Sequence, residues 1–383
     1  MACADTATYT LDGLEEVELR IARDQETIAR AVTETVSAKE FVALILAGGY
    51  GRGEGGYRHT TTGVRPYNDY DYFVVLRGNR AQIARNRRRL ESLGQKLEHQ
   101  TGVEVDFAIL RESKLCRMPF TLMNAELRQG YRVIAGKQDV LESMPRMPVG
   151  QVPLAEFTRL LLNRGSLLLM NEQALARRAL ASEEDREQFR RYIDKSILAS
   201  GDARLAAASR YDLSWHTKLA RLRRLPERGS GRLSERYEQA LRTRTGGHVP
   251  AFDEKDARLM QDSAVSDWLA ALQEVEAARL GSSPDWTEYS TTRVPKGQDG
   301  RHKLAWFKNM ALTARDFGPM EWVRNYAWSI RYPRERLVSV LPALLSPTLR
   351  VPAANINRAL SLADHADSPT ASASFLKYWA RYN

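Results

Sequence analysis

Three segments decide the fold of this chain: FVALILAGGYGRGEGG at 41–56, PYNDYDYFVVL at 66–76 and VEVDFAIL at 103–110. Each contains a short apolar run with the aromatic and β-branched residues that are typical of a buried strand. The first run leads into several glycines, and residues without a Cβ atom let phosphate oxygens approach main-chain N–H groups. The three segments therefore predict neighbouring strands beside a phosphate-binding loop.

Carboxylates stand near the start of the second and third strands. Asp69 and Asp71 should project from one face, because strand side chains alternate with a period of two. Asp106 adds a third carboxylate from the neighbouring strand, and Glu104 on the same face is an alternative. Such oxygen ligands suit two Mg²⁺ ions, or Mn²⁺, that bridge an attacking hydroxyl, an α-phosphate and a leaving pyrophosphate. We therefore expect Asp69, Asp71 and Asp106 to be catalytic and to bind the metal.

This arrangement resembles the DNA polymerase β-type nucleotidyltransferase superfamily. Its signature is Gly-Gly or Gly-Ser, a spacer, Asp-x-Asp or Asp-x-Glu, and a later acidic strand. Gly48-Gly49, Asp69-Tyr70-Asp71 and Asp106 occupy these positions here, and the loop GGYGRGE is similar to that of the nitrogen-regulatory PII-protein uridylyltransferases. The resemblance covers roughly residues 20 to 140. It implies transfer of a nucleotide from an NTP, with ATP as the default, to an acceptor hydroxyl.

The chain departs from this signature in the spacer, which is longer than usual and holds YRHTTTG at 57–63. A flexible excursion is expected there. No serine follows Gly48, so the phosphate contact would come from Arg52 or from main-chain amides; an ion pair with Glu54 is the other interpretation of Arg52. Lys195 and Asp202, on a predicted helix, would reach the triphosphate or the acceptor unless they belong to an ordinary helical surface. The candidate nucleotide-binding residues are Gly48, Gly49, Tyr50, Gly51, Arg52 and Lys195.

Two other phosphate-binding patterns compete for the same glycines. A Rossmann fingerprint needs G-x-G-x-x-G at the start of a helix, whereas these glycines lead into the poorly helical stretch 57–63. The run LILAGGYGRG at 44–53 also resembles the opening of sugar-nucleotide pyrophosphorylases, but no lysine occurs between Lys39 and Lys96 to hold a sugar phosphate. A noncatalytic nucleotide-binding scaffold is a further alternative.

The pattern of apolar residues predicts two domains. An α/β (α+β) sheet domain at 1–143 is followed by a proline-rich linker at 144–153 and an all-α helical-bundle domain at 154–383. A mobile connection is expected at 227–253 and a second loop at 281–301. The aromatic residues after that loop are expected to form core, with a platform for an aromatic ligand as the alternative; they are Trp306, Phe307, Phe317, Trp322, Tyr326 and Trp328. The predicted elements of the first domain are helices at 19–40, 81–99 and 120–127 and strands at 41–47, 70–76, 103–110 and 131–135.

Composition indicates which compartment and which kinds of acceptor to expect for the protein. The chain has 383 residues, two cysteines and no apolar run long enough to cross a membrane, and its N-terminus lacks the features of a secretion signal. A cytoplasmic protein with a small-molecule or protein acceptor is therefore expected. The net charge of +10 leaves RNA open as an acceptor. The basic clusters at 85–90 and 221–228 are nevertheless most simply interpreted as solvated helix faces.

Overall fold

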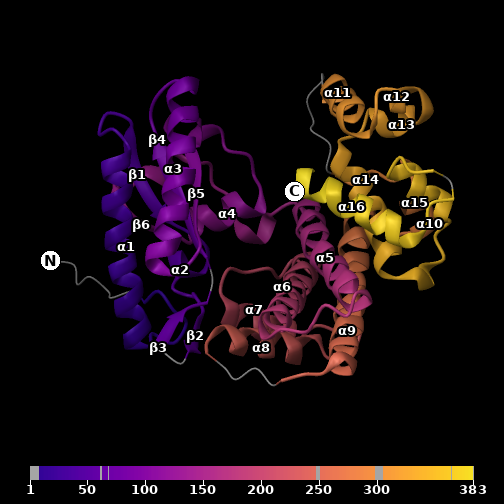
Figure 1. Cartoon of the computed structure of the whole chain (residues 1–383), viewed down its shortest axis with the longest axis horizontal. Coiled ribbons are helices and arrows are strands. Elements are labelled where there is room, and N and C mark those ends of the chain that lie inside the picture. Colours follow the sequence, from indigo (N-terminus) through magenta and orange to yellow (C-terminus); the bar gives the residue numbers. More distant parts are fainter. Residues whose placement is uncertain are drawn as a thin grey trace. The chain divides into compact units, whose positions relative to one another are not determined.

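The computed structural model describes residues 8–60, 63–67, 69–246, 251–297, 305–363 and 365–382. The chain divides into two units, and Val152 ends the first continuous stretch of the first unit (Figure 1). The first unit also takes in Asp212–Trp215 and Leu241–Pro250, which lie far along the chain from its sheet. A small mixed sheet near the N-terminus and a large helical part agree with the α/β-then-helical organisation expected from the sequence.

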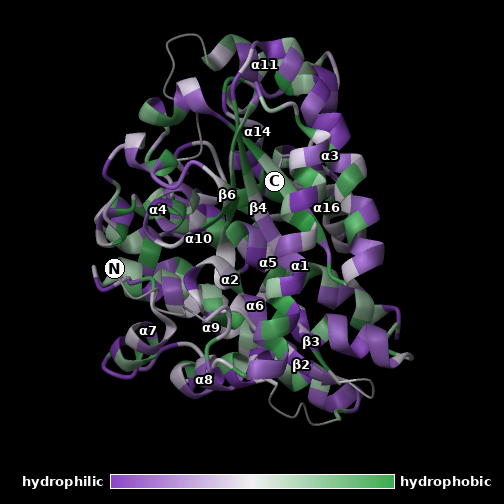
Figure 2. Ribbon diagram, turned by 90° about the vertical axis from the view of Figure 1, so that its left-hand side faces the viewer, coloured by the Kyte–Doolittle hydropathy of each residue, from purple (hydrophilic) through white to green (hydrophobic). Residues whose placement is uncertain are grey.

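The sheet of the first unit has the strand order β5-β4-β1-β6. Its strands are β1 (Phe41–Leu46), β4 (Tyr70–Leu76), β5 (Val105–Arg111) and β6 (Arg132–Gly136), which lie within two residues of the predicted ranges. β4 and β5 are parallel and are joined by helix α3 (Arg80–Thr101), whereas β1 runs antiparallel to β4 and β6. In Figure 2 the strands β4 and β6 are mostly hydrophobic; β4 is buried except at Asp71, whereas β6 is only partly buried.

Helices α1 (Glu15–Thr35) and α3 pack side by side over one face of this sheet (Figure 1). On that face the Tyr70 and Tyr72 rings are buried, and their hydroxyls donate to Asp24 Oδ2 (2.8 Å) and Gln25 Oε1 (2.5 Å) of α1. Because side chains alternate along β4, Asp71 between these tyrosines points to the opposite face. The apolar contacts beneath the helices come from Val17, Ile21, Ile28, Val32, Leu44, Leu46, Val74, Leu90 and Leu97.

The long spacer is not a flexible excursion over its described residues. Strands β2 (Tyr57–Thr60) and β3 (Gly63–Pro66) pair as an antiparallel two-stranded sheet. The buried Tyr50 fixes both ends of this hairpin, because its hydroxyl donates to Gly56 O (2.6 Å) and accepts from Tyr67 N (3.1 Å). The prediction failed because the residue that orders the spacer precedes it in the sequence and lies in the short helix α2 (Gly48–Arg52).

Long helices form the body of the second unit: α5 (Leu154–Ala176), α6 (Glu183–Ala207) and α9 (Glu254–Leu280) pack against one another. Gly165 of α5 makes room for the ring of Trp268, since a Cβ atom there would lie 2.6 Å from the ring. The Trp268 indole donates to Leu161 O (2.7 Å), so its polar atom is satisfied inside the bundle. A glycine therefore sets the close approach of α5 and α9.

The expected connection at 227–253 contains a helix, α8 (Leu233–Arg244), so that prediction is wrong over this range. Arg236 pairs with Asp267 of α9, and the Tyr237 hydroxyl donates to Asp202 Oδ1 of α6. These tertiary partners stabilise a segment whose own sequence is mostly polar. The expected loop at 281–301 contains the single turn α10 (Trp286–Tyr289), and its residues 298–301 lie outside the described ranges.

The remaining helices are short, apart from α11, α14 and α16. They are α4 (Leu122–Gln129), α7 (Trp215–Leu222), α11 (Ala305–Phe317), α12 (Glu321–Arg324), α13 (Tyr326–Ser329), α14 (Pro333–Leu345), α15 (Ala353–Ala359) and α16 (Ser368–Tyr382). Four 3₁₀ turns are described: η1 (Glu112–Arg117), η2 (Val140–Ser143), η3 (Val149–Gln151), which lies in the expected linker, and η4 (Pro347–Leu349). Within the described ranges, no helix is both long and apolar enough to cross a membrane.

Candidate active site

Two of the predicted carboxylates lie directly opposite each other. Asp71 of β4 and Asp106 of β5 are paired residues in the parallel ladder, and both are exposed. Paired residues of neighbouring strands project from the same face, and the strands themselves are about 4.8 Å apart. The two side chains therefore share the face of the sheet that α1 and α3 leave free.

Asp69 lies just before β4 and contributes to the same electrostatic environment. The pKa of Asp106 is raised, first because the carboxylate is partly desolvated and then because the negative charges of Asp69 and Glu98 lie near it. Glu104, the other candidate for the third carboxylate, precedes β5, and its main-chain oxygen accepts from Tyr70 N (2.9 Å). The ladder places Asp106, not Glu104, opposite Asp71.

The carboxylates of Asp69, Asp71 and Asp106 are ligands of the type found in magnesium sites, but they do not converge on a single point. Among the described residues, no three His, Cys, Asp or Glu side chains converge closely enough to enclose a metal ion. Carboxylates of like charge repel one another, and a cation bound between them offsets that repulsion. Carboxylate oxygens from Asp69, Asp71 and Asp106 are the ligands that Mg²⁺ prefers, so the residues fit the ion by type and by strand register.

Gly48 touches this site through its main chain. Its φ of +63° is in the left-handed region, and a Cβ atom on it would lie 2.6 Å from Asp71 Oδ2. The preceding residue is also fixed to β4, because Ala47 N donates to Asp71 O (2.9 Å). Glycine is therefore required at position 48 both for the backbone conformation and for space beside the carboxylate.

The other loop residues mostly serve the main-chain packing of the loop. A Cβ atom on Gly51 would lie 2.3 Å from Leu46 O, and one on Gly49 would lie 3.1 Å from Glu54 O. The side chain of Tyr50 is buried, and its hydroxyl holds the β2–β3 hairpin. From Gly48 to Gly51, only the main chain is thus suited to a phosphate contact.

Arg52 lies between two carboxylates of the first unit. Its Nε is 3.7 Å from Glu54 Oε2, and its Nη1 is 3.9 Å from Glu126 Oε2. The second oxygen of Glu54 accepts from Trp215 N (3.0 Å). The ion pair with Glu54 that was weighed from the sequence is therefore present. Glu126 was missed, because no local pattern links α4 to a glycine loop more than seventy residues earlier.

Lys195 and Asp202 lie on α6 of the second unit. Lys195 is partly buried, and its place in a nucleotide site stays a prediction. Asp202 is engaged inside this unit: Oδ2 accepts from Lys218 Nζ (2.9 Å) and Oδ1 accepts from Tyr237 (2.9 Å). The buried pair of Asp202 and Lys218 joins α6 to α7, which is a structural role.

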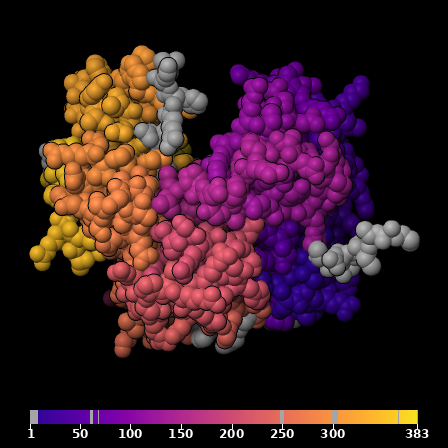
Figure 3. Space-filling view, turned by 180° about the vertical axis from the view of Figure 1, so that it is seen from behind, coloured from indigo at the N-terminus to yellow at the C-terminus, as the bar shows by residue number. Residues whose placement is uncertain are grey.

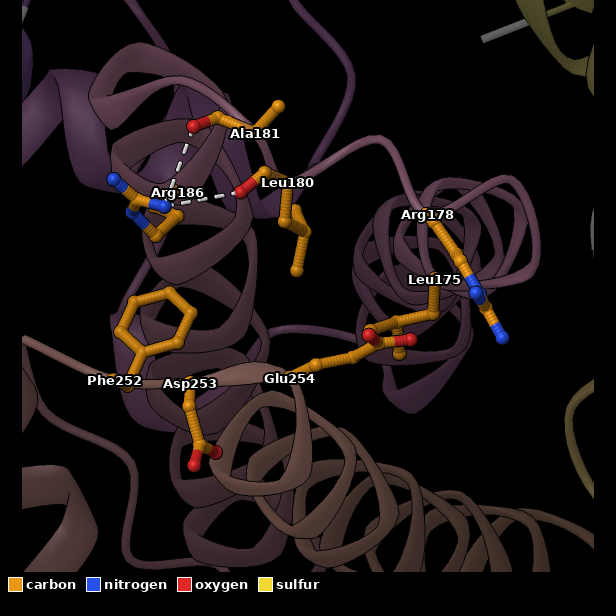
Figure 4. Close-up of a pocket in the computed structure, with 8 residues that line it drawn as sticks. All are labelled: Leu175, Arg178, Leu180, Ala181, Arg186, Phe252, Asp253 and Glu254. Carbon is orange, nitrogen blue, oxygen red and sulfur yellow. Dashed lines mark hydrogen bonds between the residues drawn. The ribbon is translucent and has the colours of Figure 1, made fainter.

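The second unit also has a small pocket of about 140 Å³ where α5 ends and α6 and α9 begin. Figure 4 shows Arg186 directed at the carbonyl oxygens of Leu180 and Ala181, to which its Nη1 donates at 3.1 and 3.4 Å. Asp253 at the pocket caps α9 by accepting from Asp256 N (2.8 Å). Ligand pockets are typically about 300 Å³ or larger, so this one is too small for a nucleotide.

Searches against family models, curated proteins and solved structures all find no match to this chain.

Proposed function

We propose that the protein is a Mg²⁺-dependent nucleotidyltransferase of the DNA polymerase β type, which moves an NMP from an NTP to an acceptor hydroxyl and releases pyrophosphate. The observation that carries this proposal is the pairing of Asp71 with Asp106 across parallel strands, with the main chain of Gly48 against the Asp71 carboxylate. A sheet edge that served packing alone would have no use for like charges placed opposite each other.

In this proposal Asp69, Asp71 and Asp106 hold the metal, for which Mg²⁺ is favoured and Mn²⁺ is a substitute. The ions would lower the pKa of the acceptor hydroxyl and offset the charge that develops on pyrophosphate. Asp106 would orient the acceptor hydroxyl and receive its proton, because it lies at the outer strand of the pair. The nucleophile, the phosphorus and the departing oxygen would thereby be held in line.

The glycine loop would bind the triphosphate through main-chain atoms of Gly48, Gly49, Tyr50 and Gly51. Arg52 would add a positive charge beside them, partly offset by Glu54 and Glu126, and Lys195 is proposed as a contribution from the second unit. ATP is the default nucleotide, and the acceptor is a small molecule or a protein. A cytoplasmic location belongs to the same proposal; the exposed free thiol of Cys116 fits a reducing compartment.

A second candidate function is transfer to RNA. The observation that favours it is a group of exposed aromatic and basic side chains on α11 to α13, which a small-molecule enzyme would not need. The sugar-nucleotide pyrophosphorylase and scaffold alternatives have no comparable support, because the lysine of the former is missing from the sequence and the latter does not require the paired carboxylates.

The test is release of pyrophosphate from each common α-³²P-labelled NTP with Mg²⁺, with a cell extract as the source of acceptor. Asp71→Asn keeps the shape of the side chain and removes its charge, and it should abolish release and labelling. Asp139→Asn is the matched control, because Asp139 is an exposed carboxylate of the same unit whose ion pair with Lys137 is itself exposed. The fraction that carries the label identifies the acceptor class. Release that persists in Asp71→Asn, or no release from any NTP, would refute the proposal.

A further inference from the structure

Four aromatic side chains on α11 to α13 are exposed. Trp306, Phe307, Trp322 and Tyr326 have between 41% and 58% of their surface accessible, in contrast to the aromatic core expected from the sequence. Only Trp328 of the expected tryptophans is buried in this segment. Figure 3 shows the residues of this segment, in orange, at the molecular surface. Large exposed rings gathered on one short stretch are typical of a binding surface.

The scaffold beneath these rings is well packed. Arg336 of α14 is fully buried and donates to Glu321 Oε1 (2.8 Å) and to Ala359 O (3.1 Å). Its guanidinium also lies 4.3 Å from the centre of the Phe317 ring. The exposed rings are thus carried by helices that a buried charge fixes to the rest of the second unit.

The charges exposed beside these rings are positive. The two acidic side chains within α11 and α12 are hidden: Asp316 is 1% exposed and Glu321 is 4% exposed. Lys308 and Arg324 are exposed among the aromatic residues. We call the group of Trp306, Phe307, Lys308, Trp322, Arg324 and Tyr326 the aromatic–basic surface.

A groove at the end of α11 is also lined by aromatic and basic side chains. Arg315, Lys377, Tyr378 and Arg381 line it, together with Asp316. Arg315 and Arg381 both pair with the Asp316 carboxylate, at 2.9 and 2.6 Å, so the groove keeps a net positive charge. Lys308 and Arg315 lie seven residues apart on the exposed face of α11, which places cations along about 10 Å of helix.

We propose that the aromatic–basic surface binds single-stranded RNA. Exposed rings stack on unpaired bases, while neighbouring cations neutralise the phosphates. Met320 and Val323 of the same segment are also exposed, at 56% and 54%, and the cations Lys308 and Arg324 give this apolar surface the positive charge that suits phosphates beside stacked bases. RNA is favoured over DNA because unpaired bases are the ordinary state of RNA loops and ends. RNA bound here would also be the acceptor of the transferase, and only this last step rests on the proposed function.

The experiment measures binding of a fluorescent oligouridylate to the full chain by anisotropy at several salt concentrations. The test variant is Phe307→Ala/Lys308→Gln. The matched control is Lys255→Gln/Leu259→Ala, which removes an exposed cation and an apolar side chain of α9 that is 57% exposed, against 56% for Phe307. We expect binding to weaken about tenfold or more in the test variant, with a shallower salt dependence, and to be unchanged in the control.

Each other outcome counts against the proposal. Equal affinity of the two double variants would show that this surface is not the binding site, and equally tight binding of an RNA duplex would rule out stacking on unpaired bases. A wild-type chain with no affinity for oligouridylate would overturn the proposal and leave the surface to a protein partner. Unfolding midpoints of both variants check that the fold is intact.

The Asp71→Asn variant separates this inference from the proposed function. It should bind oligouridylate as tightly as the wild type while losing pyrophosphate release. If pyrophosphate release depends on Asp71 but RNA binding is unchanged in Phe307→Ala/Lys308→Gln, the transferase proposal stands and the RNA-surface proposal is refuted. The reverse combination would keep the RNA surface and discard the transferase.

Discussion

The carboxylate of Asp71 leaves no room for a side chain on Gly48, since a Cβ atom there would lie 2.6 Å from Asp71 Oδ2. The glycine loop and the first carboxylate strand are therefore in direct contact, although about twenty residues separate them in the sequence. Any group added at position 48 must displace the carboxylate or the loop.

Gly48→Ala should consequently damage both stability and transfer. The left-handed φ of +63° costs a residue with a Cβ atom about 1–2 kcal/mol, and the collision with Asp71 adds to that. We expect pyrophosphate release to fall by about 100-fold, because displacement of a reacting group by about 1 Å has an effect of this size. Gly150→Ala is the control, since nothing lies within 4 Å of the added Cβ atom. Chemical denaturation measures the free energy of unfolding, and the release assay measures the activity. A Gly48→Ala variant with unchanged stability and activity would contradict the close contact between Gly48 and Asp71.

Asp106→Asn should separate function from stability. The substitution removes a charge that is partly desolvated and repelled by Asp69, so the free energy of unfolding should stay the same or rise slightly. Release of pyrophosphate should fall by about 100-fold or more, because a metal ligand and proton acceptor are lost. A variant that unfolds more easily but keeps its activity would show that Asp106 is a structural residue. Denaturant titration in the absence of Mg²⁺ and the release assay in its presence are the measurements.

Tyr50→Phe should loosen the β2–β3 hairpin. The substitution removes one hydroxyl that serves both Gly56 O and Tyr67 N, and an unsatisfied buried polar group costs about 1–3 kcal/mol. Amide hydrogen exchange at 57–60 and 63–67 should accelerate while exchange in β1 and β4 changes little. Tyr131→Phe, at a partly buried tyrosine of the same unit, is the control. Unchanged exchange in the hairpin would mean that other contacts hold it.

Because of Lys296, the free energy of unfolding should increase as the pH rises from about 7 to about 10.5. Burial lowers its pKa from 10.5 to about 7, against the opposing effects of Glu335 and Glu276, while Arg279 and Arg331 lower it further. Between these two values the unfolded chain holds a proton that the folded chain has released, so stability rises with pH through that window and is smallest below it. The contribution is on the order of a few kcal/mol.

Lys296→Met removes this titration, so its stability relative to the wild type should be highest at about pH 6.5 and should decline towards pH 9.5. Urea unfolding at several pH values measures the difference. Lys255→Met, at an exposed position of α9, should show no such trend. A difference that is constant with pH would mean that Lys296 is charged in the folded protein throughout.

The four strands of the β5-β4-β1-β6 sheet were predictable because each is a short apolar run bounded by polar residues. The common face of the sheet from which Asp71 and Asp106 project was also predictable, because both precede apolar runs that must be buried on adjacent strands. Their joint role as a metal site stays a prediction, as does the contribution of Lys195.

The features that could not be predicted from the sequence depend on contacts between residues that are far apart in the chain. The helix α8 looks like a polar connection until Asp267 and Asp202 supply partners for Arg236 and Tyr237. The exposure of Trp306 and Trp322 was missed for a similar reason. The spacing of aromatic residues in the sequence does not tell which rings are buried, because the packing of α11 and α13 against α14 decides which of them stay exposed.

The hydroxyl of Tyr50 closes the base of the hairpin at Gly56 and Tyr67. Beyond that clasp the hairpin is held further, because the Tyr57 hydroxyl donates to Asp12 Oδ2 (2.6 Å) and Val64 N donates to Glu16 Oε1 (3.1 Å). Because Tyr57 and Val64 also belong to the hydrophobic core of the first unit, the hairpin is an integral part of that core, and a substitution at either residue should lower the stability of the whole unit.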